Sequence, residues 1–117
     1  MSASAKQAQR LLFICSHNLQ RSVTAEKLFE GANGYEVTSA GTERAARVRV
    51  TEEHVKWADI IFVMEHKHVD VLRTKFKEAL PGKRMICLEI PDRYGYMSFE
   101  LIKVLKKRLS AYIAVPD

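Results

Sequence analysis

Short apolar runs alternate with helical patterns along this chain, and that alternation limits the fold more than any other feature. Strand-like runs cover residues 11–14, 35–39, 59–64 and 85–88. Apolar side chains recur at helical spacing in residues 23–30, 51–57, 66–76 and 98–113. Nearly continuous apolar strands that alternate with helices are typical of a parallel sheet buried on both faces. We therefore predict an α/β fold, a three-layer domain with helices on both faces of the sheet.

The size of the chain favours one domain. Its 117 residues, 47% of them apolar, are enough for a single core and too few for two. Residues 1–9 are small and polar, so we expect a disordered N-terminal tail followed by one domain over residues 10–117. The apolar run at residues 11–14 is far too short for a signal-peptide core or a membrane span. We expect no export and no membrane partner.

Cysteine content and charge exclude some classes of protein. Cys15 and Cys87 cannot build a disulfide framework, and no His or Cys pair has the spacing of zinc ligands. These features predict a reducing cytoplasm and no metal. The net charge is +5, and the densest basic run, at residues 103–108, lies in a helical pattern of apolar positions, so a solvated helix face accounts for this run. No nucleic-acid-binding motif accompanies the charge, so we do not expect a nucleic-acid partner.

The residues with the clearest chemistry lie between the first strand and the first helix. Cys15 directly follows the strand, and Arg21 and Ser22 directly precede the helix. Ligands of parallel sheets bind beyond the strand C-termini, and a loop entering a helix turns its N–H groups toward an anion. The sequence therefore predicts a phosphate site formed by the loop residues Ser16, His17, Asn18, Leu19 and Gln20 together with Ser22.

The residue types in this loop fit phosphoryl transfer to sulfur. The helix dipole, Arg21 and the Ser22 hydroxyl would all favour the thiolate of Cys15. Arg21 can place two N–H groups on two phosphate oxygens, and Asn18 tolerates the left-handed conformation that a tight anion loop requires. A single cysteine at a strand end is usually a small buried apolar residue. The functional interpretation therefore depends on the whole constellation.

These residues resemble a known family. "CSHNLQRS" at 15–22 is similar to the phosphate-binding loop of the low-molecular-weight protein tyrosine phosphatases, which has Cys, two residues, Asn, two residues and Arg-Ser. The segments "SAGT" at 39–42, "ARVRVT" at 46–51, "ADIIFVME" at 58–65 and "PDRY" at 91–94 resemble further family segments in the same order. The similarity covers nearly all of the chain after the tail.

The resemblance implies a four-stranded parallel sheet and hydrolysis of phosphotyrosine or related aryl phosphates through a phosphocysteine, with no metal or cofactor. Its substrates would be phosphorylated proteins or small aryl phosphates, and inorganic phosphate the product. Cys15 would be the nucleophile, Arg21 the phosphate clamp and Asp92 the general acid. Ser22 would support the thiolate, and Asn18 with Ser39 would support the loop.

Several positions depart from the family pattern. His17 replaces a common glycine, Gln20 replaces a second cysteine, and Val23 replaces a proline. Without that second thiol, no loop neighbour is available to trap an oxidised Cys15 as a disulfide. Only residues 43–45 separate the "SAGT" and "ARVRVT" segments, where typical members have a longer stretch with a helix. We therefore expect a shortened wall and a more open site.

Asp92 has two interpretations. It lies between Pro91 and Gly95 in ordinary turn chemistry, where an aspartate commonly bonds to backbone amides. The proposed reaction, however, needs a proton donor for the leaving group, and a carboxyl on a loop beside the site is suitable. Tyr94 and Tyr96 would either flank an aryl substrate or simply pack.

Two alternatives to a phosphatase stay open. The loop would also suit a non-catalytic module that binds phosphate or phosphopeptides. An arsenate reductase on the same fold would use Cys15 but needs further cysteines, and Cys87 lies in the apolar stretch "MICLEI", where a core position is expected. The cysteine count disfavours this second alternative.

Overall fold

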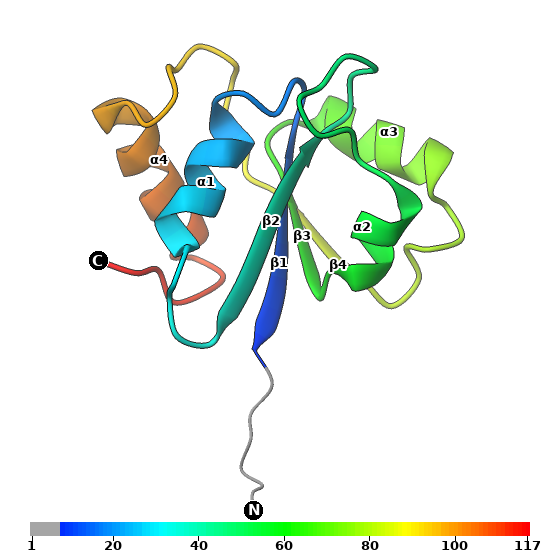
Figure 1. Ribbon diagram of the computed structural model, residues 1–117, viewed down its shortest axis with the longest axis horizontal. Coiled ribbons are helices and arrows are strands. Elements are labelled where there is room, and N and C mark those ends of the chain that lie inside the picture. The colour runs from blue at the N-terminus through cyan, green and yellow to red at the C-terminus, as the bar shows by residue number, and fades with distance from the viewer. Residues whose placement is uncertain (1–7) are drawn as a thin grey trace, which may run out of the picture.

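The computed structural model describes residues 8–117, which form one four-stranded parallel sheet with helices on both faces (Figure 1). The strands are β1 (Gln9–Cys15), β2 (Tyr35–Gly41), β3 (Ile60–Val63) and β4 (Arg84–Cys87). The helices are α1 (Arg21–Phe29), α2 (Glu52–Trp57), α3 (His66–Lys75) and α4 (Phe99–Leu109). Both the predicted fold class and the predicted order of elements are confirmed.

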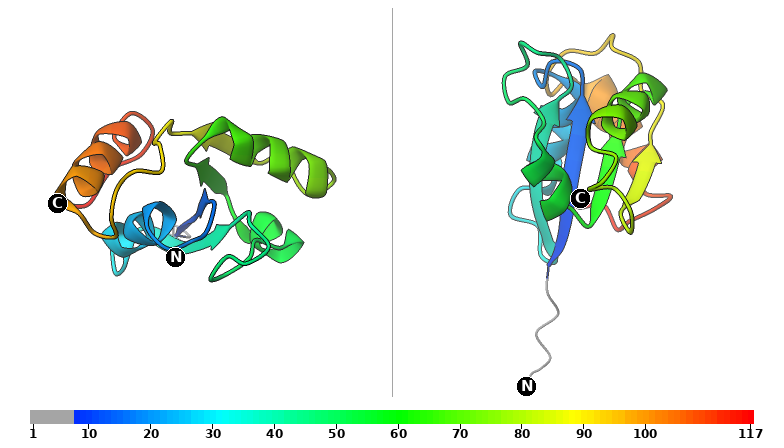
Figure 2. Two further views of the ribbon diagram at one scale, coloured as in Figure 1. Left: turned by 90° about the horizontal axis from the view of Figure 1, so that it is seen from above. Right: turned by 90° about the vertical axis from the view of Figure 1, so that its right-hand side faces the viewer.

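The strand order β2-β1-β3-β4 places β1 in the interior of the sheet. The chain leaves β1 toward β2 on one side, and β3 then pairs with β1 on the other side. The C-terminal end of β1 is therefore the topological switch point, where parallel sheets bind their ligands. Figure 2 shows the two helical layers on either side of the sheet.

Side chains of β1 alternate between two cores. Leu11 and Phe13 face α1 and α4, where they pack with Phe29 and Leu105. Leu12 and Ile14 face α2 and α3 and pack against another group of buried residues that includes Val55 and Leu72. Because both faces are covered, β1 is buried from Leu11 to Cys15. This burial explains the continuous apolar run in the sequence.

Element ends differ from the predictions at both termini of the described chain. The expected tail at residues 1–9 overlaps β1, because Gln9 pairs with Tyr35; the rest of that prediction, at residues 1–7, lies outside the described residues. Helix α4 ends at Leu109, earlier than the predicted end at residue 113, since the chain turns there and packs Ile113 against the core. In α4, Leu101, Leu105 and Leu109 are buried, and the basic run lies on the opposite, more exposed face.

None of the helices in the described part of the chain has the length and apolar character needed to cross a membrane.

Candidate active site

The loop that joins β1 to α1 lies at the switch point. Cys15 ends β1, Arg21 begins α1, and both residues are buried. Between them Asn18 has a φ of 58°, the left-handed conformation that asparagine tolerates better than most residues. Of the other predicted loop residues, Ser16 is buried, Gln20 is partly buried, and His17 and Leu19 are exposed.

A chain of side-chain hydrogen bonds holds Asn18. Its Nδ2 group donates to Ser22 Oγ at 2.7 Å and to Ser39 Oγ at 2.9 Å. Ser39 Oγ in turn donates to Glu26 Oε1. Because a carboxylate only accepts, the Ser39 hydrogen is committed to Glu26, and Ser39 must accept from Asn18. Glu26 therefore fixes which way the Asn18 amide faces.

The same chain determines the hydrogen bond at the nucleophile. Ser22 Oγ accepts from Asn18 and lies 2.9 Å from Cys15 Sγ. Since the hydroxyl already accepts from the amide, its own hydrogen is free to point at the sulfur. The sulfur therefore has a hydroxyl group in hydrogen-bond contact. The predicted residues Cys15, Asn18, Ser22 and Ser39 are thus brought together.

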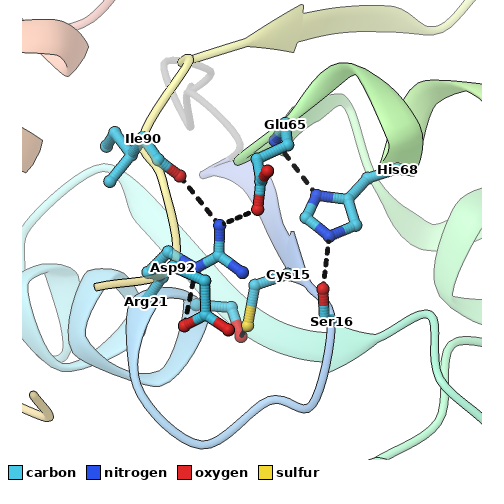
Figure 3. A network of polar contacts seen from close by, with 8 residues as sticks. Cys15, Ser16, Arg21, Glu65, His68, Ile90 and Asp92 are labelled. Atoms are coloured by element: carbon cyan, nitrogen blue, oxygen red, sulfur yellow. Dashed lines mark hydrogen bonds and ion pairs between the residues drawn. The ribbon is translucent and has the colours of Figure 1, made fainter. Parts of the chain in front are cut away.

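Arg21 is buried and held by groups from distant parts of the chain (Figure 3). Its Nη1 atom donates to Glu65 Oε2 and, at 2.8 Å, to the carbonyl oxygen of Ile90. Within residues 8–117 no hydrogen bond engages Nε or Nη2. That edge of the guanidinium has the two parallel N–H groups that suit an oxyanion. The anchors leave it available for phosphate.

Asp92 lies beside Arg21 on the segment that follows β4. Its Oδ1 atom is 3.8 Å from Arg21 Nε, and half of its side chain is exposed (Figure 3). The Ile90 carbonyl anchors the start of this segment to the same guanidinium. A carboxyl group therefore stands next to the arginine edge that suits phosphate, with access to solvent. The predicted residues Arg21 and Asp92 are thus close to each other.

Glu65 and His68 were not singled out from the sequence. Glu65 directly follows β3, and the rule that ligands bind beyond strand C-termini could have found it. Burial alone would raise the pKa of the Glu65 carboxyl, but the hydrogen bond and charge of Arg21 bring it below its usual value. His68 is fully buried in the first turn of α3, with Nε2 2.9 Å from Ser16 Oγ. No sequence motif pointed to it.

The shortened segment after Thr42 folds back onto the loop. Thr42 N donates to the Cys15 carbonyl, Glu43 N to the Ser16 carbonyl, and Arg47 N to the His17 carbonyl, each at 3.0 Å. These bonds turn loop carbonyls away from the anion position. The side chains of Glu43, Arg44 and Ala45 are exposed.

Gly41 makes this close approach of the two segments possible. A Cβ atom added there would lie 2.5 Å from the Ser16 carbonyl oxygen and 2.7 Å from Ala46 Cβ. Backbone atoms cannot yield to such a contact without a shift of the loop. The glycine of the "SAGT" segment is therefore required by packing, as expected where two backbones meet.

The two predicted aromatic residues differ in their surroundings. Tyr94 packs partly against the core on the α1 and α4 side, and the Arg93 guanidinium lies 5.3 Å from its ring centroid. Tyr96 is half exposed. The neighbouring Met97 donates its backbone N–H to Thr24 Oγ1, which ties this segment to the first turn of α1. Of the two side chains, that of Tyr96 is the more exposed to solvent.

Cys87 lies at the end of β4, away from the nucleophile. The register pairs Ile14 with Val63 and Val63 with Cys87, so two inter-strand spacings, about 10 Å, separate Cys87 from the end of β1. A disulfide needs Cα atoms within about 7 Å. Burial raises the pKa of the Cys87 thiol. Both cysteines are free, and within residues 8–117 no three His, Cys, Asp or Glu side chains are arranged to hold a metal ion.

Similar proteins were found among solved structures. Wzb, a tyrosine phosphatase from Escherichia coli K30 in complex with phosphate, is 21% identical; the match covers 91% of this chain and 96% of Wzb, with a TM-score of 0.71. A low-molecular-weight protein tyrosine phosphatase from T. tengcongensis is 20% identical, with coverages of 88% and 94% and a TM-score of 0.66. The arginine phosphatase YwlE from Geobacillus stearothermophilus is 23% identical, with the same coverages and a TM-score of 0.60. The chain has the fold of the low-molecular-weight protein tyrosine phosphatases. No family model and no curated protein matched the sequence.

Proposed function

We propose that this protein hydrolyses phosphate monoesters, with Cys15 as nucleophile and aryl phosphates such as phosphotyrosine as substrates. The observation that carries the proposal is the convergence of three groups on one loop. Ser22 Oγ is 2.9 Å from the Cys15 sulfur, the free edge of the buried Arg21 guanidinium lies at the same loop, and Asp92 is 3.8 Å from that guanidinium. In this proposal Cys15 serves as nucleophile, Arg21 as phosphate clamp and Asp92 as proton donor.

The first chemical step forms a phosphocysteine. The loop amides and the Nε and Nη2 edge of Arg21 hold the phosphate oxygens while the Cys15 thiolate attacks phosphorus. The bond from phosphorus to the ester oxygen breaks, and Asp92 gives its proton to that oxygen so that a neutral phenol leaves. Arg21 stabilises the charge that spreads over the equatorial oxygens in the transition state.

The second step regenerates the enzyme. Asp92 is now a carboxylate and takes a proton from water as the water oxygen attacks phosphorus. The sulfur–phosphorus bond breaks, inorganic phosphate leaves, and the sulfur again receives the Ser22 hydrogen bond. YwlE was also solved as a cysteine-to-serine mutant with a phosphorylated active-site serine, which supports a phosphoenzyme on this fold.

Exposed apolar side chains on the loop and on the segment after β4 are the reason to propose aryl substrates. The side chains of Leu19 and Tyr96 are about half exposed, and Met97 is 39% exposed. Exposed apolar side chains such as that of Leu19, which belongs to the loop itself, would favour contact with a phenyl ring. Because the neighbours include both tyrosine and arginine phosphatases, phosphotyrosine and phosphoarginine peptides should be compared directly.

The two alternatives make different demands on the structure. An arsenate reductase would need a second thiol near Cys15, and Cys87 is two strands away. A binding module would need the phosphate loop alone, whereas here Asp92 also lies next to Arg21. The phosphatase proposal accounts for both facts. We also propose that the protein works in a reducing compartment such as the cytoplasm, because both of its cysteines are free thiols.

The deciding experiment is hydrolysis of p-nitrophenyl phosphate by the purified protein with and without a chelator. We expect turnover in both conditions. Cys15→Ser should abolish turnover but still bind inorganic phosphate, because the loop amides and Arg21 are unchanged; Cys87→Ser is the matched control and should stay active. Phosphate binding without turnover by the wild type would identify a binding module, and activity lost on chelation would overturn the metal-independent mechanism.

A further inference from the structure

His68 joins two parts of the site that lie far apart in the sequence. Its Nε2 atom is 2.9 Å from the hydroxyl of Ser16, the residue after the nucleophile. Its Nδ1 atom accepts the backbone N–H of Glu65 at 3.0 Å, and the Glu65 carboxylate holds Arg21 (Figure 3). The first turn of α3 therefore contacts the loop at two places. His68 contacts Ser16 next to Cys15, and Glu65 contacts Arg21.

The two contacts define the state of the ring. Because a backbone N–H only donates, Nδ1 must be the unprotonated acceptor, and the single ring hydrogen of neutral His68 is on Nε2. Nε2–H then donates to Ser16 Oγ. A second proton on Nδ1 would face the Glu65 N–H at 3.0 Å and would break that contact. The arrangement holds only for the neutral ring.

On the basis of the proposed function, we propose that His68 is a positioning residue: its neutral ring holds Ser16, and through it Cys15, in a fixed place relative to the Arg21 clamp. The ring is fully buried and Ser16 nearly so, so the contact is shielded from solvent. Loss of the contact would let the first loop residue move independently of the clamp. A misplacement of about 1 Å between reacting groups can cost about a hundredfold in rate.

The surroundings keep the ring neutral. The charged groups around it are Arg21 on α1, Glu65 and Lys67 at the start of α3, and Asp92 on the segment that follows β4. Burial, followed by the charge of Arg21, lowers the pKa of His68 to about 4, while the two carboxylates act in the opposite direction. An ordinary histidine would be mostly protonated at pH 5.5. The neutral ring of His68 thus keeps its contact with Ser16 in mildly acidic solution.

A double-mutant cycle tests the link between the ring and the nucleophile. His68→Leu and Ser16→Ala should each lower kcat for p-nitrophenyl phosphate by about tenfold to a hundredfold with a smaller change in KM. The double variant should be no slower than the slower single one, because both changes break one interaction. His68→Gln, which cannot be protonated and offers an amide donor, should recover most of the loss. Losses that multiply in the double variant would overturn the proposal.

His54 provides a matched control. Its Nδ1 accepts the Thr51 N–H at 2.9 Å in the first turn of α2, the same arrangement as His68 and Glu65, with no contact to the loop. His54→Leu should therefore change stability without changing kcat. If His54→Leu lowers kcat as much as His68→Leu, the effect is general destabilisation and the proposal fails.

Two readouts do not require turnover and separate this proposal from the proposed function. The alkylation rate of Cys15 by iodoacetate, followed by peptide mass, should fall in His68→Leu and Ser16→Ala and should fall no further in the double variant. Nitrogen-15 NMR should show His68 neutral and protonated on Nε2 at pH 5.5. A charged ring at that pH, or recovery of kcat by His68→Lys and not by His68→Gln, would show a cationic role instead. If the wild-type protein shows no phosphatase activity but gives the expected alkylation and NMR results, the proposed function fails and the positioning role of His68 stands.

Discussion

The Ser22 hydroxyl lies 2.9 Å from the Cys15 sulfur and accepts from the Asn18 amide, so its own hydrogen is available to a thiolate. The orientation of the Asn18 amide is set by Glu26, a carboxylate that reaches the loop through Ser39. Three further side chains therefore hold the hydroxyl group that contacts the nucleophile. Most of these groups are buried, so their interactions are little weakened by water.

We expect Ser22→Ala to make Cys15 less reactive. A hydrogen bond to a charged group contributes about 1.5–3 kcal/mol, so the rate of alkylation by iodoacetate at neutral pH should fall by about tenfold or more. Ser98→Ala removes a serine that caps α4 and should alter stability without altering this rate. Unchanged alkylation in Ser22→Ala would show that the hydroxyl does not support the thiolate.

Arg21→Lys should lower kcat/KM by about a hundredfold to a thousandfold, the usual effect of removing a donor to transition-state charge. An ammonium cannot keep the contacts to Glu65 and Ile90 while also placing two N–H groups on phosphate. Arg47→Lys is the control, since Arg47 is exposed and its side chain makes one hydrogen bond, to the Asn18 carbonyl. Near-native kinetics in Arg21→Lys would assign the arginine a structural role alone.

Gly41→Ala should destabilise the fold by about 2 kcal/mol or more, because the added Cβ would lie 2.5 Å from the Ser16 carbonyl oxygen. Gly95→Ala is a matched substitution, since a Cβ there meets no atom within 4 Å. Thermal unfolding of the two variants measures the difference. Equal melting temperatures would mean that the segment after β2 adapts without cost.

The fold could be predicted from sequence because its signals are local. The buried strands are short apolar runs, and α2 and α4 begin at residues that cap a helix, Thr51 and Ser98. The start of β1 and the end of α4 could not be predicted from sequence, because both depend on contacts with distant residues. Gln9 extends β1 only because it pairs with Tyr35, and α4 ends where Ile113 turns back to the core.

The part of the candidate site that could be predicted from sequence is the part whose residues lie in one loop. Cys15, Asn18, Arg21 and Ser22 are close in sequence, so their types and spacing indicate an anion site. Glu65 and His68 come from another crossover of the sheet, and a glutamate and a histidine at the start of a helix have many ordinary uses. Their relation to Ser16 and Arg21 depends on the pairing of β3 with β1, which sequence spacing does not reveal.

His68 should make the fold less stable as the pH falls from about 6.5 to about 4. Its pKa in the folded protein is about 4. Between that value and the ordinary pKa of about 6.5 the unfolded chain binds a proton that the folded protein does not, so stability is lost as pH decreases. The loss should be on the order of 2 kcal/mol. Urea unfolding of wild type and His68→Gln at pH 7 and pH 4.5 measures it; an equal decrease in both proteins would contradict the assignment.

Asp92→Asn tests the proton donor by comparing leaving groups. Asp92 lies close to Arg21 and is half exposed, so the amide should fit the same place without disturbing the loop. General acid catalysis typically contributes about a hundredfold to ten-thousandfold, and the first chemical step should slow by that order for phenyl phosphate. For p-nitrophenyl phosphate the loss should be much smaller, because a stable phenolate hardly needs protonation.

The dependence on leaving group separates a chemical role from a structural one. A displaced loop would slow every ester by a similar factor, whereas a missing acid steepens the dependence of the rate on the pKa of the leaving phenol. The decline of wild-type activity on the basic side should also flatten in Asp92→Asn, because the group that must be protonated is gone. Glu89→Gln is the control, since that carboxyl is exposed on the same connection and makes no hydrogen bond to Arg21 in the described chain. If Asp92→Asn slows all esters equally, or slows none, Asp92 is a turn residue and another group supplies the proton.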